Sequence, residues 1–140
     1  TRQAHDAALD AALAAARPDI VCLAGYMRIM TAAFIEKWQG RMINIHPSLL
    51  PSFPGLHTHE RALDAGVSEH GCTVHFVTLG VDEGPVIAQA SVPVLPGDTP
   101  ETLSSRVLVA EHELYPAALR LVAEGRVSMT DGRVIHESVS

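Results

Sequence analysis

Two polar side chains end an otherwise apolar segment, and they are the residues of this sequence best suited to carry chemistry. Asn44 and His46 stand two positions apart in the run Met42–His46, so a strand would place both on one face. An imidazole has a reference pKa of about 6.5 and can move protons near neutral pH. An amide beside it can hydrogen-bond a developing oxyanion, so we expect proton transfer and oxyanion stabilisation here.

A carboxylate would complete such a pair, because it can orient the imidazole and favour its charged form. Asp82 is the candidate, since it lies in the connection 78–85, whose glycines and proline predict a tight turn at the same end of the sheet. A second interpretation stays open, in which Asn44 and His46 cap strand ends and Asp82 forms an Asx turn.

The histidines also raise the question of a metal, because four imidazoles can in principle converge on zinc. These four are His46, His57, His59 and His75. The His57-x-His59 spacing falls at a loop–helix boundary, and the sequence has no His-x-x-x-His or His-Glu-x-x-His pattern, so we expect no metal. The motifs of serine hydrolases, dinucleotide-binding folds and Walker loops are absent as well.

A strand, a helix and a second strand are predicted to position Asn44 and His46. Residues 20–24 are uniformly apolar, which is typical of a parallel strand buried on both faces. Thr31 is a plausible N-cap for a helix to about Gln39, and Met42–His46 follows as the second strand. This succession predicts a parallel α/β sheet, in which ligands bind beyond the carboxyl ends of the strands.

The remaining segments predict an antiparallel edge and further helices. Residues 1–17 predict a helix, 47–57 a rigid loop, and Thr58 the cap of a helix over 59–64. The segments 71–77 and 86–94 predict an antiparallel pair at the sheet edge. Thr99 predicts the start of a long helix to about Ala123, and 127–129 with 133–135 predict a terminal hairpin.

The composition describes one acidic domain with enough apolar residues for a core. The 140 residues fit a single domain, and 47% of them are hydrophobic. The net charge of −6 argues against nucleic-acid or anionic-membrane partners. No segment has the roughly 18 apolar residues of a membrane helix. The two cysteines, Cys22 and Cys72, lack metal or redox spacing, so we expect a soluble, cytoplasmic protein with buried thiols.

A long motif resembles a known family. From Asn44 to His59 the chain reads Asn-Ile-His-Pro-Ser-Leu-Leu-Pro-Ser-Phe-Pro-Gly-Leu-His-Thr-His, which resembles the signature of the phosphoribosylglycinamide formyltransferases almost letter for letter. The stretches 23–30, 71–77, 81–87 and 111–116 also resemble sequences of this family. The resemblance implies an α/β fold with a parallel, Rossmann-like sheet, an antiparallel edge and helices on both faces.

The same resemblance implies an activity. Members of this family transfer a formyl group from 10-formyltetrahydrofolate to the amine of glycinamide ribonucleotide in de novo purine synthesis, directly and without a metal. By this likeness Asn44, His46 and Asp82 are the catalytic residues. Two alternatives stay open, a formyltetrahydrofolate hydrolase and a folate-binding fragment that turns over nothing. The small molecules are the expected partners, and the chain is expected to be a monomer or a homodimer.

The resemblance also implies binding residues for both substrates. The folate is expected to lie against an apolar wall formed by Leu23, Arg28, Ile29, Met30, Phe34, Ile35, Met42, Val77 and Val81. The nucleotide substrate is expected to contact Arg2, Met27, Pro47 and Glu111. His57 and His75 are expected to support Asp82 from behind.

The chain departs from the family pattern at its beginning. Members of the family begin with a strand and a Gly-Ser-Asn type of loop that holds the substrate phosphate, and this sequence starts beyond both. Leu108 stands where a longer polar residue near the phosphate is expected. We therefore expect residues 1–140 to form a single formyltransferase domain that lacks the N-terminal strands and half of the nucleotide site.

Overall fold

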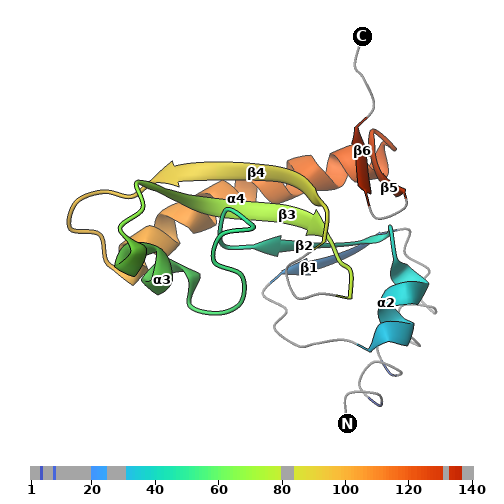
Figure 1. The fold of residues 1–140 in the computed structure, drawn as a ribbon. Helices are drawn as coiled ribbons and strands as arrows, with labels where there is room; N and C mark the ends of the chain where they lie inside the picture. The colour runs from blue at the N-terminus through green and yellow to red at the C-terminus, as the bar shows by residue number, and fades with distance from the viewer. Residues whose placement is uncertain are drawn as a thin grey trace.

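A four-stranded mixed sheet organises the chain (Figure 1). Its strands are β1 (Val21–Ala24), β2 (Met42–His46), β3 (Glu69–Phe76) and β4 (Val86–Pro93), in this spatial order. β1 and β2 are parallel, whereas β3 is antiparallel to both β2 and β4. The predicted parallel sheet with an antiparallel edge is thus confirmed.

The structure is a computed structural model that describes residues 4, 8, 20–24, 31–79, 84–130 and 133–136. Within these ranges the helices are α2 (Ala32–Trp38), α3 (Thr58–Ala65) and α4 (Pro100–Ala123). A separate antiparallel hairpin follows, formed by β5 (Val127–Thr130) and β6 (Arg133–His136), as predicted. The helix predicted over residues 1–17 lies outside the described residues except for Ala4 and Ala8, which are helical.

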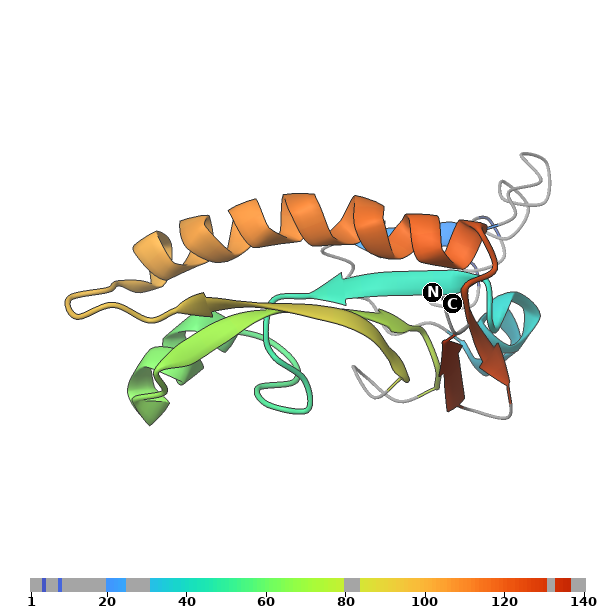
Figure 2. The same cartoon turned by 90° about the horizontal axis from the view of Figure 1, so that it is seen from above.

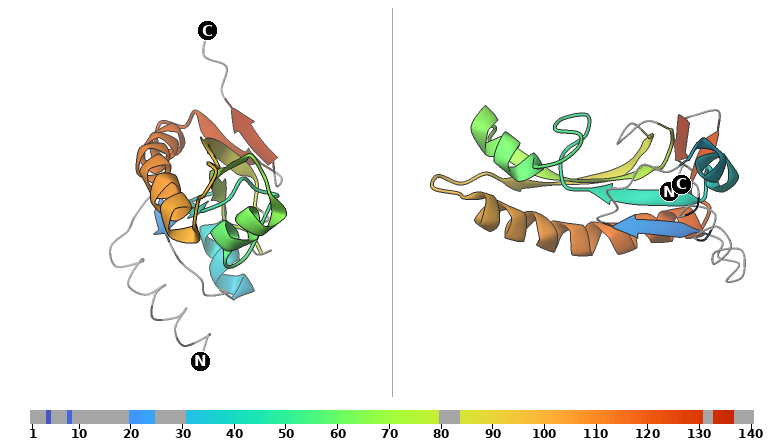
Figure 3. Two further views of the ribbon diagram at one scale, coloured as in Figure 1. Left: turned by 90° about the vertical axis from the view of Figure 1, so that its left-hand side faces the viewer. Right: turned by 90° about the horizontal axis from the view of Figure 1, so that it is seen from below.

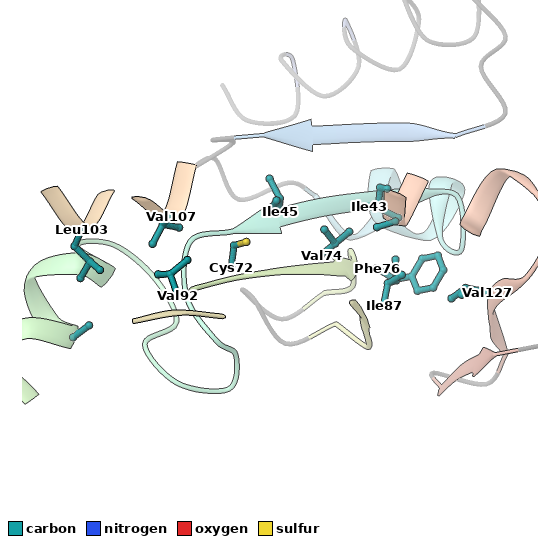
Figure 4. Close-up of a cluster of buried hydrophobic side chains, with 12 residues drawn as sticks. Ile43, Ile45, Cys72, Val74, Phe76, Ile87, Val92, Leu103, Val107 and Val127 are labelled. Carbon is teal, nitrogen blue, oxygen red and sulfur yellow. The ribbon is translucent and has the colours of Figure 1, made fainter. Parts of the chain in front are cut away.

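Helix α4 covers one face of the sheet. It runs along the strands on the side opposite the loop that follows β2 (Figures 2 and 3), and it also contacts α3. The side chains beneath it alternate along β2 and β3 and form the main hydrophobic core (Figure 4). The buried members of this core are Ile43, Ile45, Ala62, Cys72, Val74, Phe76, Ile87, Val92, Leu103, Val107, Ala118 and Val127.

Two local features fix α4 in place. Thr99 and Thr102 form a reciprocal capping box at its start, which satisfies backbone donors that a helix end leaves unpaired. Near its other end, the Tyr115 hydroxyl reaches the backbone carbonyls of Leu23 in β1 and Ile43 in β2. The helix is therefore tied to both strands of the parallel pair.

The opposite face carries a second, smaller apolar cluster. Helix α2 packs Phe34, Ile35 and Trp38 against Met42 of β2. The Thr31 side chain accepts a hydrogen bond from the Phe34 amide, which confirms the predicted cap. Helices therefore lie on both faces of the sheet, as expected.

Three local predictions differ from the structure. Helix α3 begins at Thr58, which does not cap it, because its hydroxyl donates to the Pro47 carbonyl at 2.6 Å. Strand β3 begins at Glu69, two residues before the predicted alternation. Cys22 is exposed, so the expected burial of β1 on both faces is wrong at this residue, whereas Cys72 is buried as expected. Among the described residues, no helix is both long and apolar enough to cross a bilayer.

Candidate active site

The carboxyl end of β2 carries buried polar side chains on the face away from α4. Asn44 and His46 are only 9% and 5% exposed, and they share this face with Met42. On the neighbouring strand β3, His75 pairs with Asn44 and Thr73 pairs with His46. Four polar side chains therefore stand together where the other face of the same strands is apolar.

A hydrogen bond fixes the orientation of the Asn44 amide. The Nδ1 atom of His75 lies 3.0 Å from the Phe76 carbonyl, which can only accept, so Nδ1 carries a proton. In the neutral ring Nε2 is then an acceptor, and the Asn44 Nδ2 atom at 3.3 Å donates to it. This assignment turns the Asn44 carbonyl oxygen away from His75.

That carbonyl oxygen is buried without a partner. Asn44 Oδ1 has no hydrogen bond to any described residue. A buried polar atom without a partner destabilises a fold by about 1–3 kcal/mol, so native structures seldom keep one without a use. An acceptor in this position suits a ligand that brings an N–H or O–H group to the end of β2.

The His46 ring is held by the loop that follows its own strand. Its Nε2 atom lies 3.0 Å from the Phe53 carbonyl, so Nε2 carries the proton of this bond. Phe53 has a φ of 52°, a left-handed conformation that a bulky residue rarely adopts. Such conformations persist only where the surroundings enforce them, and they gather at functional sites.

The loop 47–57 is fastened to the sheet along its length. Thr73 Oγ1 donates to the Ser48 carbonyl at 2.7 Å and accepts from the Leu50 amide at 3.1 Å. The Gln89 side chain of β4 donates to the Leu50 carbonyl at 2.8 Å. The loop also contains a cis peptide bond between Leu50 and Pro51. The predicted irregular loop is therefore present and hydrogen-bonded to the sheet, whereas its rigidity stays a prediction.

The connection between β3 and β4 returns beside His75. A side chain at Gly84 would meet the Phe76 carbonyl oxygen at 1.6 Å and His75 Nδ1 at 3.3 Å. Only glycine fits this approach. Asp82 and Val81 stand just before it in the sequence and lie outside the described residues, so the predicted third catalytic residue stays a prediction.

Two further histidines form a pair behind this loop. His59 Nδ1 and His70 Nε2 are 3.2 Å apart, and the Phe53 ring lies edge-on to His70. Burial, and to a smaller extent the nearby His59 and His46, lower the pKa of His70 to about 4. Burial also lowers the pKa of His59. Both imidazoles are therefore held neutral at neutral pH.

His57 stands apart from these groups. Its side chain is 69% exposed and its Nδ1 atom lies 3.6 Å from the Glu60 carboxylate. It occupies the position before α3 with a left-handed backbone. The structure therefore places His75 against Asn44 and places His57 on the outer surface.

The described residues of the expected folate wall gather in the cluster under α2. Phe34, Ile35, Met42 and Val77 are at most 8% exposed, whereas Leu23 packs against them and is half-buried. Their side chains serve as core at this point of the fold, next to Asn44 and His46 on the same face. The other expected wall residues, Arg28, Ile29, Met30 and Val81, lie outside the described residues.

The two described residues that are expected to bind the nucleotide substrate, Pro47 and Glu111, lie on different segments of the fold. Pro47 is half-buried directly after His46. Glu111 lies on α4, where burial raises the pKa of its carboxyl. This carboxylate also acts on Cys72, whose pKa rises to about 11 chiefly because the thiol is buried. Glu111 is thus on the α4 side of the sheet, and Arg2 and Met27 lie outside the described residues.

No group of three or more His, Cys, Asp or Glu side chains is arranged to hold a metal ion within the described part of the chain. A groove of about 580 Å³ lies elsewhere, between β4 and α4. It is lined by residues such as Val92, Arg106 and Val109, and it contains neither Asn44 nor His46. The polar end of β2 is therefore the better candidate for chemistry.

Several residues of this site were missed by sequence reasoning. Thr73, Gln89 and His70 all make contacts that join segments distant in the chain. No spacing or motif within one segment could indicate them. The positive φ of Phe53 also has no local signal, because its sequence neighbours do not include the groups that hold it.

Comparisons with known proteins agree on one family. The family profile described as formyl transferase matches residues 1–119. The chain is 57% identical over 134 residues to the trifunctional purine biosynthetic protein adenosine-3 of Bos taurus, covering 95% of this chain and 13% of that protein.

Solved structures give the same result. The glycinamide ribonucleotide transformylase 1 of Symbiobacterium toebii is 54% identical in sequence and superimposes with a TM-score of 0.94. The match covers 99% of this chain and 65% of the transformylase chain. A formyltetrahydrofolate deformylase from Pseudomonas syringae is 32% identical with a TM-score of 0.88, covering 94% of this chain and 44% of its own. The chain thus spans less than two thirds of these proteins, and it belongs to the formyl transferase family.

Proposed function

We propose that this chain carries the catalytic and folate-binding part of a phosphoribosylglycinamide formyltransferase. The reaction is the transfer of a formyl group from 10-formyltetrahydrofolate to the amine of glycinamide ribonucleotide, in purine biosynthesis. The observation that carries the proposal is the buried pair of Asn44 and His46 at the carboxyl end of β2, with Asn44 Oδ1 lacking a partner among the described residues. The identity of 54% to a glycinamide ribonucleotide transformylase, against 32% to a deformylase, favours transfer over hydrolysis.

The reaction needs groups that stabilise a negative and a positive charge next to the same carbon atom. When a neutral amine attacks the formyl carbon, a new N–C bond forms, and an oxyanion and an ammonium develop together. The bond between the formyl carbon and the folate nitrogen then breaks, and the proton lost by the ammonium is taken up by that leaving nitrogen. No metal or covalent enzyme intermediate is needed for this balance.

Asn44 is suited to serve both charges. Its Nδ2 group keeps a second N–H besides the one given to His75, and this N–H can donate to the oxyanion. Its Oδ1 atom can accept from the substrate amine and so orient the nitrogen lone pair. One side chain would thereby position the attacking amine and the formyl oxygen relative to each other.

His46 is proposed to stabilise the oxyanion together with Asn44, and Asp82 is proposed to take part in removing the proton of the ammonium. A protonated His46 presents a second donor through Nδ1, since Nε2 already donates to Phe53. Asp82 would favour the imidazolium and, through water, discharge the ammonium. Gly84, two positions after Asp82, lies against His75, which places the return of this connection beside the site.

The folate is proposed to lie at the edge of the α2 cluster. Leu23 keeps exposed surface there, so we propose it as a contact for the ring, and Phe34, Ile35, Met42 and Val77 as the support behind it. The ribonucleotide is proposed to contact Arg2, Met27, Pro47 and Glu111. A cytoplasmic location and small-molecule partners belong to the same proposal.

The experiment that tests the function compares acceptors. The purified chain, alone and extended by the N-terminal segment of a longer relative, is incubated with 10-formyltetrahydrofolate, with and without glycinamide ribonucleotide. Formylated ribonucleotide and tetrahydrofolate in equal amounts support the transferase. Formate released without an acceptor would point to a hydrolase. Calorimetric binding of a folate analogue with no turnover, restored when the N-terminal segment is supplied, would identify a binding fragment.

A further inference from the structure

A row of three side chains crosses the sheet at the carboxyl end of β2. His46 pairs directly with Thr73 across β2 and β3, and Thr73 pairs directly with Gln89 across β3 and β4. Directly opposed residues of an antiparallel pair have their side chains on the same face. Only Thr73 therefore separates Gln89, on the edge strand β4, from His46 in this row.

The middle residue of this row uses its full hydrogen-bonding capacity. The Thr73 hydroxyl donates to the Ser48 carbonyl and accepts from both the Leu50 amide and the Gln89 Nε2 group, at 3.1 and 3.0 Å. A hydroxyl has one donor and two acceptor positions, so no capacity is left over. Thr73 thus holds two points of the loop only as long as its own orientation is fixed.

Gln89 supplies that fixation. Its amide nitrogen has two hydrogens, and both are used, one on Thr73 Oγ1 and one on the Leu50 carbonyl at 2.8 Å. Leu50 is therefore held at its amide by Thr73 and at its carbonyl by Gln89. This residue of the loop cannot shift without breaking both bonds.

The restraint on Leu50 continues to Phe53. Ser48 Oγ donates to the Ser52 carbonyl at 2.6 Å, and Ser52 in turn donates its amide to Leu49. Phe53 follows with its left-handed backbone, and its carbonyl accepts the proton of His46 Nε2. We propose that Gln89 is a positioning residue for His46, which it holds through Thr73, the loop 48–52 and the carbonyl of Phe53.

The far side of the loop has a separate anchor. Both terminal nitrogens of Arg61 on α3 donate to the Pro54 carbonyl at 2.6 Å, and the guanidinium lies over the Phe53 ring. The loop therefore stays attached when Gln89 is lost. The expected consequence of losing Gln89 is a misdirected Phe53 carbonyl and a freer His46 ring within a folded domain.

The test replaces Gln89 by methionine, which has nearly the same length and no donor. Long-range ¹H–¹⁵N NMR on the His46 ring should show one tautomer, protonated at Nε2, in the unaltered chain and a mixture in Gln89→Met. In whichever form of the protein catalyses formyl transfer, kcat should fall about tenfold while KM for both substrates changes less than about twofold. Ser91→Ala, an exposed change on the same strand, is the matched control and should alter neither.

The kinetic arm rests on the proposed function, whereas the NMR arm does not. A mixed His46 tautomer in Gln89→Met supports the inference even if no formyl transfer is found. An unchanged His46 signal, or one that shifts equally in Ser91→Ala, overturns it even if the chain is an active transferase. Gln89→Asn, which draws the amide back by one methylene, gives the same test if the methionine variant fails to fold. A fall in melting temperature without a change at His46 would assign Gln89 a structural role only.

Discussion

The two faces of β2 and β3 are built from alternate residues of the same segments, and they solve opposite problems. On the α4 face, Ile43, Val74 and Phe76 are packed and need no partners. On the other face, Asn44 and Thr73 are buried to a similar degree but carry polar atoms. The first face is stabilised by removing apolar area from water, and the second stays intact only because nearly every polar atom on it is hydrogen-bonded.

The comparison shows where function can reside in such a sheet. The core beneath α4 consists of apolar side chains, which offer a substrate no hydrogen-bonding group. Two buried side-chain atoms of the described residues lack a hydrogen-bond partner, Asn44 Oδ1 on the polar face and His70 Nδ1 in the histidine pair behind the loop. A ligand site is expected where a buried polar atom lacks a hydrogen-bond partner within the protein.

The largest expected effect is on the polar face. His46→Ala should lower kcat/KM for formyl transfer by about 10²–10³-fold, because it removes the cationic donor proposed to stabilise the oxyanion. His46→Gln keeps a donor for the Phe53 carbonyl but carries no positive charge, so it should lose nearly as much. Steady-state kinetics with thermal melts separates this effect from unfolding. Retained rates in either variant would remove His46 from the mechanism.

The next effect belongs to the apolar face. Phe76 is fully buried, so Phe76→Ala should lower the free energy of unfolding by about 3–5 kcal/mol through lost transfer energy and a cavity. Leu79→Ala, at a side chain that is 61% exposed, should change it by less than about 0.5 kcal/mol. Urea denaturation measures both. Any Phe76→Ala protein that stays folded should keep most of its turnover, and a selective loss of turnover would break the division between the faces.

A pH titration tests the histidines behind the loop. The pKa of His70 is about 4 in the folded chain, whereas an unfolded histidine has a pKa of about 6.5. Between these values the unfolded chain binds more protons, so stability is full above about pH 6.5 and falls by about 2–3 kcal/mol toward pH 4.

Denaturation midpoints at several pH values measure the slope of stability against pH between about pH 6.5 and pH 4. His70→Phe should flatten the slope over that interval, because it removes a group that must stay neutral in the fold. His57→Gln, at an exposed side chain, should leave the slope unchanged. Equal slopes in all three proteins would show that the buried pair does not control acid stability.

The smallest effects come from exchanging the polarity of adjacent residues. Thr73→Val keeps the shape of the side chain but leaves the Ser48 carbonyl and the Leu50 amide without their partner. Val74→Thr places a hydroxyl in the apolar core beside α4. Each should lower the free energy of unfolding by about 1–3 kcal/mol, as measured by urea denaturation. A neutral result for either one would mean that the two faces differ less than their contacts indicate.

The sequence predicted those parts of the fold that depend on neighbouring residues. The apolar run at β1 and the mixed run at β2 indicated a parallel pair, which the structure confirms, although Cys22 of β1 is exposed and not buried as its pattern indicated. Thr31 and Thr99 were recognised as caps, since a cap bonds within its own turn. Thr58 was misjudged because its hydroxyl bonds to Pro47, eleven residues earlier, and no local rule includes that partner.

The candidate site was predictable to a smaller extent. Asn44 and His46 were indicated by polarity at the end of an apolar strand, and the structure brings both to one face. The Gln89 contacts arise only once β4 pairs with β3, so they are a property of the register. The placement of Asp82 stays a prediction, which comes from the turn at 78–85 and from the family resemblance.

The close approach of Gly84 to Phe76 has a consequence for how this chain tolerates change. A substituent there would overlap a backbone oxygen, which cannot rotate away as the tip of a flexible side chain can. In a saturation-mutagenesis experiment, position 84 should therefore reject even alanine, although its residue has no side chain and carries no proposed role. Intolerance at such a position would report the path of the backbone and should not be mistaken for a sign of catalysis.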